Sequence, residues 1–250
     1  MKCKHCNNEF IANPLLQGDI VCKTCVAMND LSFWYPILKQ IQMRVPITKL
    51  VYIDDELYLE RKKDDHFKEF YNEVLIKAKI IGFPLFIRTG HLSNKWDWKK
   101  SCYVESKDQL LHNIYNLCEF SAIVEFPLGI PCNWWALREI IPSKPYFQSF
   151  NGMPITREFR YFIRDGKVEC FHPYWQKSVF RDNYYSPEQD VFDEMNKLTN
   201  DEMTELREMS EYIGNYFSGY WSIDYLQAID GKWYCIDMAI GERSFHYKHE

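Results

Sequence analysis

The C-terminal half of the chain contains two stretches in which apolar and polar residues alternate on both sides of an Asp-Gly dipeptide. The first, REFRYFIRDGKVECFHPYW, turns at Asp165-Gly166, and the second, WSIDYLQAIDGKWYCIDMAIG, turns at Asp230-Gly231. Alternation is typical of a strand with one buried face, and Asp-Gly between two such runs is a strong signal for a two-residue β-turn. The pattern therefore predicts two antiparallel hairpins.

Helical periodicity is clearest in other parts of the chain. It predicts helices over residues 56–81 and 106–120, with Ser106 as the N-cap of the latter, and two more over PEQDVFDEMNKL and TNDEMTELREMSEYIGNYF. Two further short runs are predicted strands: GFPLFIRTG, ending at Arg88, and NWWALREIIP, stopped at Pro142. Hairpins mixed with helices in this order indicate an α+β fold with antiparallel sheets.

Composition narrows the classes of function. The 250 residues are 46% hydrophobic and carry a formal net charge of −5, which argues against a mainly electrostatic grip on nucleic acid or anionic lipid. No apolar run approaches the roughly 18 residues of a membrane helix, and MKCKHCNNEF begins no secretory signal. We therefore expect a protein of a reducing, cytoplasm-like compartment that contacts no membrane.

Four cysteines near the N-terminus have the spacing of a zinc site. Cys3 and Cys6 form one Cys-x-x-Cys pair, Cys22 and Cys25 form another, and fifteen residues separate the pairs. Two such turns direct four thiolates at one point, as a tetrahedral Zn²⁺ ion requires, and the metal then supplies folding energy to a small segment. The spacing predicts a zinc ribbon, with two disulfides or a redox pair as the alternative.

The second hairpin places two acids in otherwise apolar strands. In the register that a two-residue loop at Asp230-Gly231 sets, Asp224 lies directly opposite Asp237, with Cβ atoms roughly 4.5–5.5 Å apart. Like charges in that position are destabilising unless a cation lies between them, and Mg²⁺ prefers carboxylates together with phosphate oxygens and water. The pair is therefore a candidate nucleotide–magnesium site. A protonated acid, a salt bridge to Arg or a slipped register is the alternative.

The order of these segments resembles the ATP-grasp superfamily over about residues 45–245. The matching segments are the strand ending in Arg88, the loop HLSNKWDW, the REIIP strand, REFRYFIRDGKV and the hairpin with the two aspartates. The resemblance is strongest to a compact clade found in phage and bacterial genomes, and extends to eukaryotic ATP-grasp proteins that assist translation-factor assembly. It implies an N-terminal lobe at 31–136 and a C-terminal lobe at 137–250, with ATP between the lobes. The zinc ribbon, which we place at 1–30, lies outside the resemblance.

The resemblance also assigns roles to individual residues. It implies that the hinge around residues 137–142 holds adenine and ribose, through Arg138, Glu139 and Ile141. It also implies that Arg88, Ser93 and Lys95 contact the phosphates. Catalytic contacts to the γ-phosphate or an acyl phosphate are implied for Lys95, Arg157 and Arg160. Mg²⁺ binding is implied for Asp224 and Asp237. Ala239 departs from the family, because many members carry Asn there; Glu242 or Ser244 could replace it. Arg88 as a strand-end charge and Lys95 as a loop cation packed on aromatic rings are the plain alternatives.

The usual chemistry of that family joins a carboxylate to an amine or thiol through an acyl phosphate, and this is the function we expect. ATP, Mg²⁺ and Zn²⁺ are the implied cofactors, and the partners are an unidentified carboxylate and amine, including peptide or protein acceptors. Two other functions stay open: an ATP-binding assembly factor without ligase activity, and an ATP-grasp kinase.

Overall fold

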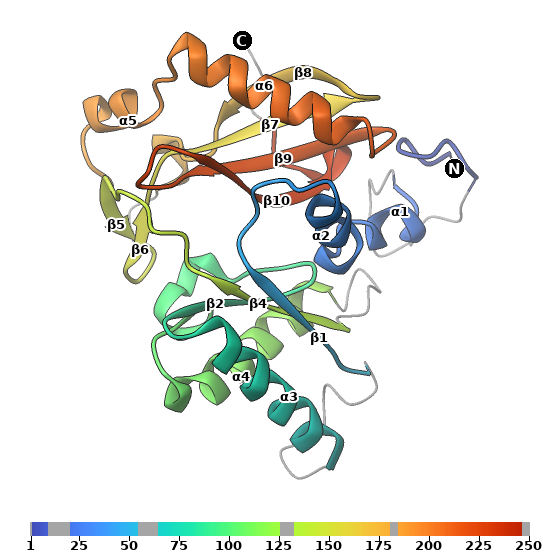
Figure 1. Cartoon of the computed structure of the whole chain (residues 1–250), viewed down its shortest axis with the longest axis vertical. Helices are drawn as coiled ribbons and strands as arrows, with labels where there is room; N and C mark the ends of the chain where they lie inside the picture. The colour runs from blue at the N-terminus through green and yellow to red at the C-terminus, as the bar shows by residue number, and fades with distance from the viewer. Residues whose placement is uncertain (1, 10–20, 55–64, 126–132, 181–184, 247–250) are drawn as a thin grey trace.

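The computed structural model describes residues 2–9, 21–54, 65–125, 133–180 and 185–246 (Figure 1). Its described part has two lobes, each built on a four-stranded antiparallel sheet, and a small N-terminal ribbon beside the C-terminal lobe (Figure 1). No helix in these ranges is long and apolar enough to cross a membrane.

The N-terminal lobe has a sheet with two helices on one face. Its strands lie in the order β1 (Thr48–Tyr52), β4 (Trp134–Glu139), β2 (Leu85–Thr89) and β3 (Tyr103–Val104), and the helices are α3 (Asp65–Ile81) and α4 (Lys107–Glu125). Ile87 and Leu137 are paired neighbours that pack into the core beneath α3 and α4. Because strand side chains alternate, Arg88 and Arg138 lie on the opposite face, toward the other lobe.

The C-terminal lobe has a sheet in the order β10 (Trp233–Ile240), β9 (Tyr220–Gln227), β7 (Glu158–Arg164) and β8 (Lys167–Pro173). Helix α6 (Asn200–Gly214) covers its outer face and follows the short α5 (Gln189–Met195) (Figure 1). A second core joins this sheet to α6 and includes Phe159, Tyr161 and Leu206. The alternate residues of β7, Glu158 and Arg160, therefore face the N-terminal lobe.

Three smaller pieces connect and flank the lobes. Helices α1 (Lys23–Ala27) and α2 (Leu31–Gln40) follow the ribbon, and the hairpin of β5 (Phe147–Ser149) and β6 (Met153–Ile155) lies at the opposite side of the cleft (Figure 1). Short 3₁₀ helices occupy Lys95–Lys100, which is kinked at Asp97, Lys177–Val179 and Gly241–Arg243. Helix α2 was not expected from the sequence. It begins at the N-cap Asp30 and buries Trp34 and Leu38 despite Pro36 inside it.

The expected elements are present with shifted ends. The α+β class with antiparallel sheets is confirmed. The first predicted helix begins at Asp65, and residues 55–64 lie outside the described ranges. The hairpin between β7 and β8 turns at Asp165-Gly166 with φ values of 45° and 81°, the left-handed pair that a type I′ turn requires. The lobe boundary expected at residue 137 falls inside β4.

The hairpin of β9 and β10 differs from the prediction near its turn. Ala228 N–H donates to the Lys232 carbonyl, so the loop has three residues and ends at Gly231 with φ of 85°. The register then changes by one residue between Cys235 and Asp237, a β-bulge. The bulge brings Asp224 opposite Asp237 after all. Between the turn and the bulge, Trp233 and Cys235 are buried, whereas Ile229 in the loop is 71% exposed.

Candidate active site

A row of polar side chains crosses the cleft face of the C-terminal sheet. Asp237 of β10 pairs with Asp224 of β9, Asp224 pairs with Arg160 of β7, and Arg160 pairs with His172 of β8. The Arg160 guanidinium donates to both Asp224 oxygens, at 2.6 and 2.7 Å. This is the bidentate geometry of a strong ion pair. The Arg salt bridge left open as an alternative for one of the two acids is therefore present.

Asp237 is held from the other lobe. Arg88 Nη1 lies 2.9 Å from its Oδ1, so β2 and β10 meet at this pair. Burial alone would raise the pKa of Asp237, but Arg88, Lys95 and Arg138 outweigh it and lower the pKa overall. Asp237 is therefore ionised at neutral pH, and its half-buried carboxylate faces three cations, Arg88, Lys95 and Arg138.

Lys95 and Arg160 lie against the same aromatic ring. Lys95 Nζ is 4.8 Å and the Arg160 guanidinium carbon 4.9 Å from the centre of the Tyr174 ring, both within the range of cation–π contacts. Burial opposes the charge of Lys95, but Tyr174, Glu158 and the two aspartates raise its pKa. Lys95 is therefore a fixed cation at the wall of the cleft, together with Ser93 from the same loop.

Two adjoining cavities open between the lobes. The larger, of about 670 Å³, is lined by Ser93, Lys95, Arg160 and Asp237 together with the aromatic side chains of Trp96, Phe150, Tyr174, Trp175 and Phe245. The smaller, of about 110 Å³, contains residues 139–141 and is closed by Leu226 and Ile236. Lys95 and Asp237 line both cavities. One elongated ligand could therefore pass from the apolar end to the charged end.

The expected hinge residues surround the smaller cavity. Arg138 donates from Nη1 to the Ile236 carbonyl at 2.6 Å and from Nε to Thr48 Oγ1 at 3.2 Å. Burial is the main cause that lowers the pKa of Arg138 to about 10, and repulsion from Arg88 is the next. Glu139 accepts a hydrogen bond from Ile47 N–H at 2.7 Å, so its carboxylate already supports the start of β1. Ile141 lines the cavity through an apolar side chain.

Arg157 lies away from this cleft. It points to the opposite side of β7, where its Nη atoms contact Glu202 at 2.6 and 3.1 Å and Gln227 at 2.6 Å. The structure thus separates Arg157 from Arg160, with which it was grouped in the sequence, because residues three positions apart in an extended chain lie on opposite faces. Through these partners Arg157 connects the start of β7 to α6.

Glu158 is a cleft residue that the sequence analysis missed. It is 2% exposed, lines the smaller cavity beside Lys95, and its Oε2 makes no hydrogen bond with the described residues. Burial raises its pKa, and Lys95 only partly offsets this. Its position two residues before Arg160 was the available signal, because residues two apart in a strand share a face.

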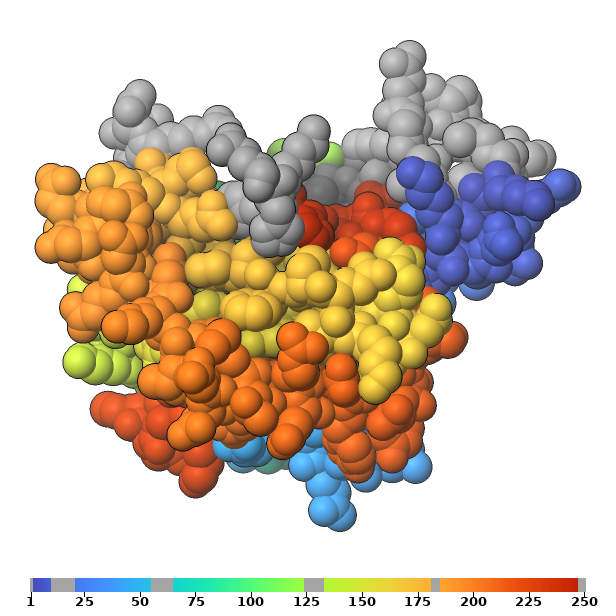
Figure 2. Space-filling model, turned by 90° about the horizontal axis from the view of Figure 1, so that it is seen from above, coloured from blue at the N-terminus to red at the C-terminus, as the bar shows by residue number. Residues whose placement is uncertain are grey.

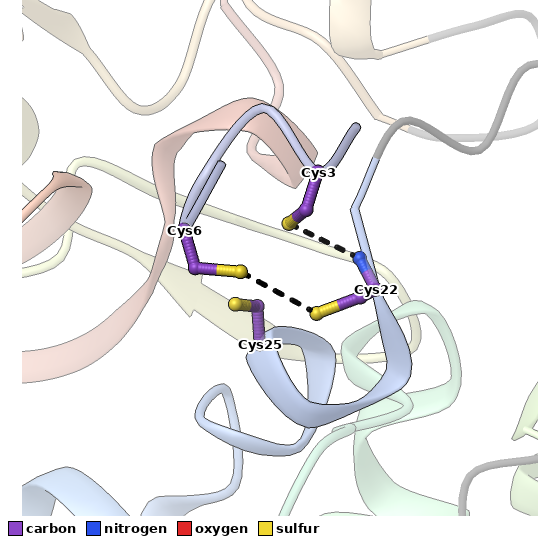
Figure 3. A group of neighbouring side chains, drawn as sticks. All are labelled: Cys3, Cys6, Cys22 and Cys25. Carbon is purple, nitrogen blue, oxygen red and sulfur yellow. Dashed lines mark hydrogen bonds between the residues drawn. The ribbon is translucent and has the colours of Figure 1, made fainter. Parts of the chain in front are cut away.

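The four N-terminal cysteines form the second candidate site. Their sulfur atoms lie within 4.8 Å of one another and point to a common centre from two turns (Figure 3). Cys6 Sγ and Cys22 Sγ are 3.8 Å apart, which matches the roughly 3.8 Å edge of a tetrahedron with Zn–S bonds of about 2.3 Å. All four cysteines are free in the structure. The donor set therefore fits Zn²⁺.

The ribbon is packed against the end of β10. Ile240 shares a small core with Cys3, Cys22 and Cys25, and His5 Nδ1 lies 3.1 Å from Glu242 Oε2. Seen from above, the blue ribbon lies against the red C-terminal segment (Figure 2). Glu242 is therefore engaged by the ribbon, and Ser244 Oγ lies 2.6 Å from Ser222 Oγ.

Comparison with known proteins identifies the fold. No family model and no curated protein matches this sequence. Among solved structures, C-terminally truncated Cdc123 from Schizosaccharomyces pombe is similar with a TM-score of 0.59 at 14% identity, over 88% of this chain and 86% of that one. This chain has the ATP-grasp fold.

Other ATP-grasp structures are similar as well. Cdc123 from the same yeast has a TM-score of 0.57 at 15% identity, over 88% of this chain and 86% of that one. A RimK domain ATP-grasp protein from Sphaerobacter thermophilus has a TM-score of 0.46 at 13% identity, over 89% of this chain and 63% of that one. At these identities the comparisons with Cdc123 show the fold alone, and the activity has to be argued from the site.

Proposed function

We propose that this ATP-grasp protein binds Mg·ATP between its lobes and uses it to join a carboxylate to an amine or thiol. The observation that carries the proposal is the chain of contacts Arg88–Asp237–Asp224–Arg160, which spans the cleft where the two cavities meet. It sets paired carboxylates, the ligands that Mg²⁺ prefers, among cations that suit a polyphosphate.

In this proposal the smaller cavity takes the adenine. Its walls combine residues 139–141 with the apolar side chains of Leu226 and Ile236. A planar base needs such apolar faces together with backbone donors and acceptors at one edge. The phosphates then extend toward Arg88 and Lys95, which line the passage to the larger cavity.

Asp224 and Asp237 would hold Mg²⁺, and the ion, when bound, offsets negative charge on the phosphates. Arg160 lies beside Asp224 at the wall of the larger cavity and is placed to contact the transferred phosphoryl group. Its burial lowers its pKa, but Asp224 outweighs this and raises it, so Arg160 keeps its charge through any physiological pH. Fixed cations stabilise the transition state without reorganisation.

The larger cavity is placed to receive the carboxylate substrate. A carboxylate oxygen would attack the γ-phosphorus while the bond to ADP breaks, and the resulting acyl phosphate would lie near Lys95 and Arg160. An amine or thiol would then attack the acyl carbon, lose its proton and release phosphate. The aromatic walls exclude water, which protects the acyl phosphate from hydrolysis.

A second function, ATP binding without ligation, is favoured by one observation. Ala239 stands where many ATP-grasp proteins have Asn, and the two residues expected to replace it are engaged elsewhere, Glu242 with His5 and Ser244 with Ser222. A protein without the usual Asn at this position could bind ATP without turnover and use it as a clamp that orders the two lobes around a partner.

Nucleotide products distinguish these functions. Purified protein is incubated with Mg·ATP and pools of carboxylates, peptides and amines, and products are followed by chromatography. ADP and phosphate that appear only with both an acid and a nucleophile support ligation. Tight binding of ATP with no turnover supports the clamp, ADP with a stable phosphorylated product supports a kinase, and AMP contradicts the ligation proposed here.

A further inference from the structure

The connection between α1 and α2, residues 28–30, together with the first residue of α2 contacts both walls of the cleft. Asn29 Oδ1 accepts a hydrogen bond from Ile240 N–H at 2.7 Å, three residues after Asp237. Leu31 N–H, next to Asp30, donates to the Gly90 carbonyl at 2.9 Å, two residues after Arg88. The connection therefore holds the ends of the two strands that supply the Arg88–Asp237 pair.

Asp30 fits tightly against the start of the loop that leads to Ser93 and Lys95. Its Oδ1 accepts from Ser32 N–H at 2.7 Å and caps α2, while its Oδ2 lies 3.5 Å from His91 Nε2. Both side chains are 9% exposed. A Cβ atom on Gly90 would lie 2.1 Å from the Asp30 carboxylate, so only glycine allows this approach. Asp30 is therefore packed directly against Gly90 and His91, and a shift of Asp30 toward this loop would have to move them.

The same connection is anchored at its other end by the cysteine cluster. Asn29 N–H donates to the Val26 carbonyl at 3.0 Å and Asp30 N–H to the Ala27 carbonyl at 3.1 Å, which closes the turn after α1. Val26 and Cys25 belong to the small ribbon core that includes Ile240. Zinc bound by the four thiolates would therefore fix α1, and α1 fixes Asn29 and Asp30.

We propose that Asp30 is a positioning residue through which the zinc ribbon sets the phosphate-binding loop, so that Zn²⁺ and Mg·ATP binding are thermodynamically linked. The inference rests on the proposed binding of ATP in the cleft. Asp30 acts through His91 and Gly90 and touches no substrate. Because linkage is reciprocal, zinc strengthens nucleotide binding by the same factor by which nucleotide strengthens zinc binding.

The first test uses Asp30→Asn, because Asn caps a helix as well as Asp does but lacks its charge. Titration calorimetry with Mg·AMPPNP on the zinc-loaded protein should show an affinity loss of about tenfold, within the usual range of coupling between sites. His91→Gln should show a similar loss, and the double variant no larger one. Asp201→Asn, an exposed first-turn acid of α6, is the matched control and should bind as the original chain does.

The second test measures the reciprocal effect without any turnover. The zinc affinity, measured by equilibrium competition with a chelating dye, should rise about tenfold when Mg·AMPPNP is added to the original chain, and should rise far less in Asp30→Asn. An unchanged zinc affinity, or an Asp30→Asn variant that binds nucleotide normally, would overturn the linkage while leaving ATP binding intact. If the unsubstituted protein does not bind Mg·AMPPNP, the proposed function itself is refuted.

Discussion

Single residues decide the charge balance of the cleft, and Asp237 has the central position. It contacts Arg88 from the opposite lobe and lies beside the Asp224–Arg160 pair of its own sheet. Substitution by Ala removes one proposed Mg²⁺ ligand and leaves Arg88 without its anion. We expect Asp237→Ala to lose Mg-dependent turnover and to weaken Mg·ATP binding by roughly 10- to 100-fold, measured by calorimetry.

Two controls accompany the Asp237 variant. Its zinc content should equal that of the original chain, because the cysteine cluster contacts the far end of β10. Asp230→Asn changes an exposed acid at the turn of the same hairpin and should bind Mg·ATP normally. Equal turnover by Asp237→Ala and the original chain would remove Asp237 from the proposed site.

Glu158 allows a prediction about pH. Its pKa is raised by burial, so the folded state favours the protonated form. This contribution to stability is fully present below the unfolded pKa of about 4.3 and is lost as pH rises through the folded value. At pH 8 we therefore expect Glu158→Gln to be more stable than the original chain by about 1–3 kcal/mol, the cost of an unsatisfied buried polar group.

The Glu158 prediction is checked by urea unfolding at several pH values. The stability advantage of Glu158→Gln should shrink as pH falls toward 4, because the original side chain then becomes neutral too. An advantage that is constant across this range would show that Glu158 does not titrate in the folded protein.

At the scale of elements, Arg157 joins β7 to α6. Its guanidinium contacts Glu202, Gln227 and the carbonyl oxygens of Met195 and Lys197. Burial opposes the charge of Glu202, but Arg157 and the capping contacts lower its pKa to about 2. Arg157→Ala should therefore destabilise the protein by about 2 kcal/mol at pH 7, seen as a lower urea midpoint, with Mg·ATP affinity unchanged.

The pH dependence of that loss has a definite sign. A lowered pKa contributes stability that is present above the unfolded value and disappears as pH falls from about 5 toward 2. The difference between Arg157→Ala and the original chain should shrink in that window. A variant of normal stability with weakened nucleotide binding would instead place Arg157 in the site.

The sequence pattern predicted the positions of the helices and strands better than it predicted which face of each strand is buried. The turn at Asp165-Gly166 was predictable because both positions need positive φ, which Asp and Gly tolerate. The bulge before Asp237 was not, because it has no residue signature and depends on packing. Strand alternation already places Arg157 and Arg160 on opposite faces, but it cannot say which of these faces meets the other lobe. The cysteine spacing was the most informative signal because it depends on local turns alone.

At the scale of the whole molecule, the ribbon packs against the C-terminal lobe. His5 lies edge-on to Trp221, with ring centres 5.7 Å apart, and a Cβ atom on Gly219 would lie 2.9 Å from the His5 ring. Loss of zinc should unfold the ribbon and expose this surface. We expect a zinc chelator to lower the melting temperature, measured by scanning calorimetry, by several degrees. Added Zn²⁺ should restore the original value.

The opposite result of the chelation experiment would contradict this expectation. A melting temperature that does not respond to chelator, in protein shown to have lost its zinc, would mean that the ribbon holds its place without metal. Cys25→Ser should reproduce the effect of chelator, whereas Cys118→Ser on α4, outside the cluster, should melt as the original chain does.

The two lobes meet at the Arg88–Asp237 pair, and the central claim is that this junction binds Mg·ATP. Titration of the protein with ATP, with and without Mg²⁺, tests it most directly. We predict saturable binding of one nucleotide per chain that strengthens when Mg²⁺ is present and is lost in the double variant Asp224→Asn/Asp237→Asn. Absence of binding, or binding that neither magnesium nor the double substitution changes, would contradict the account.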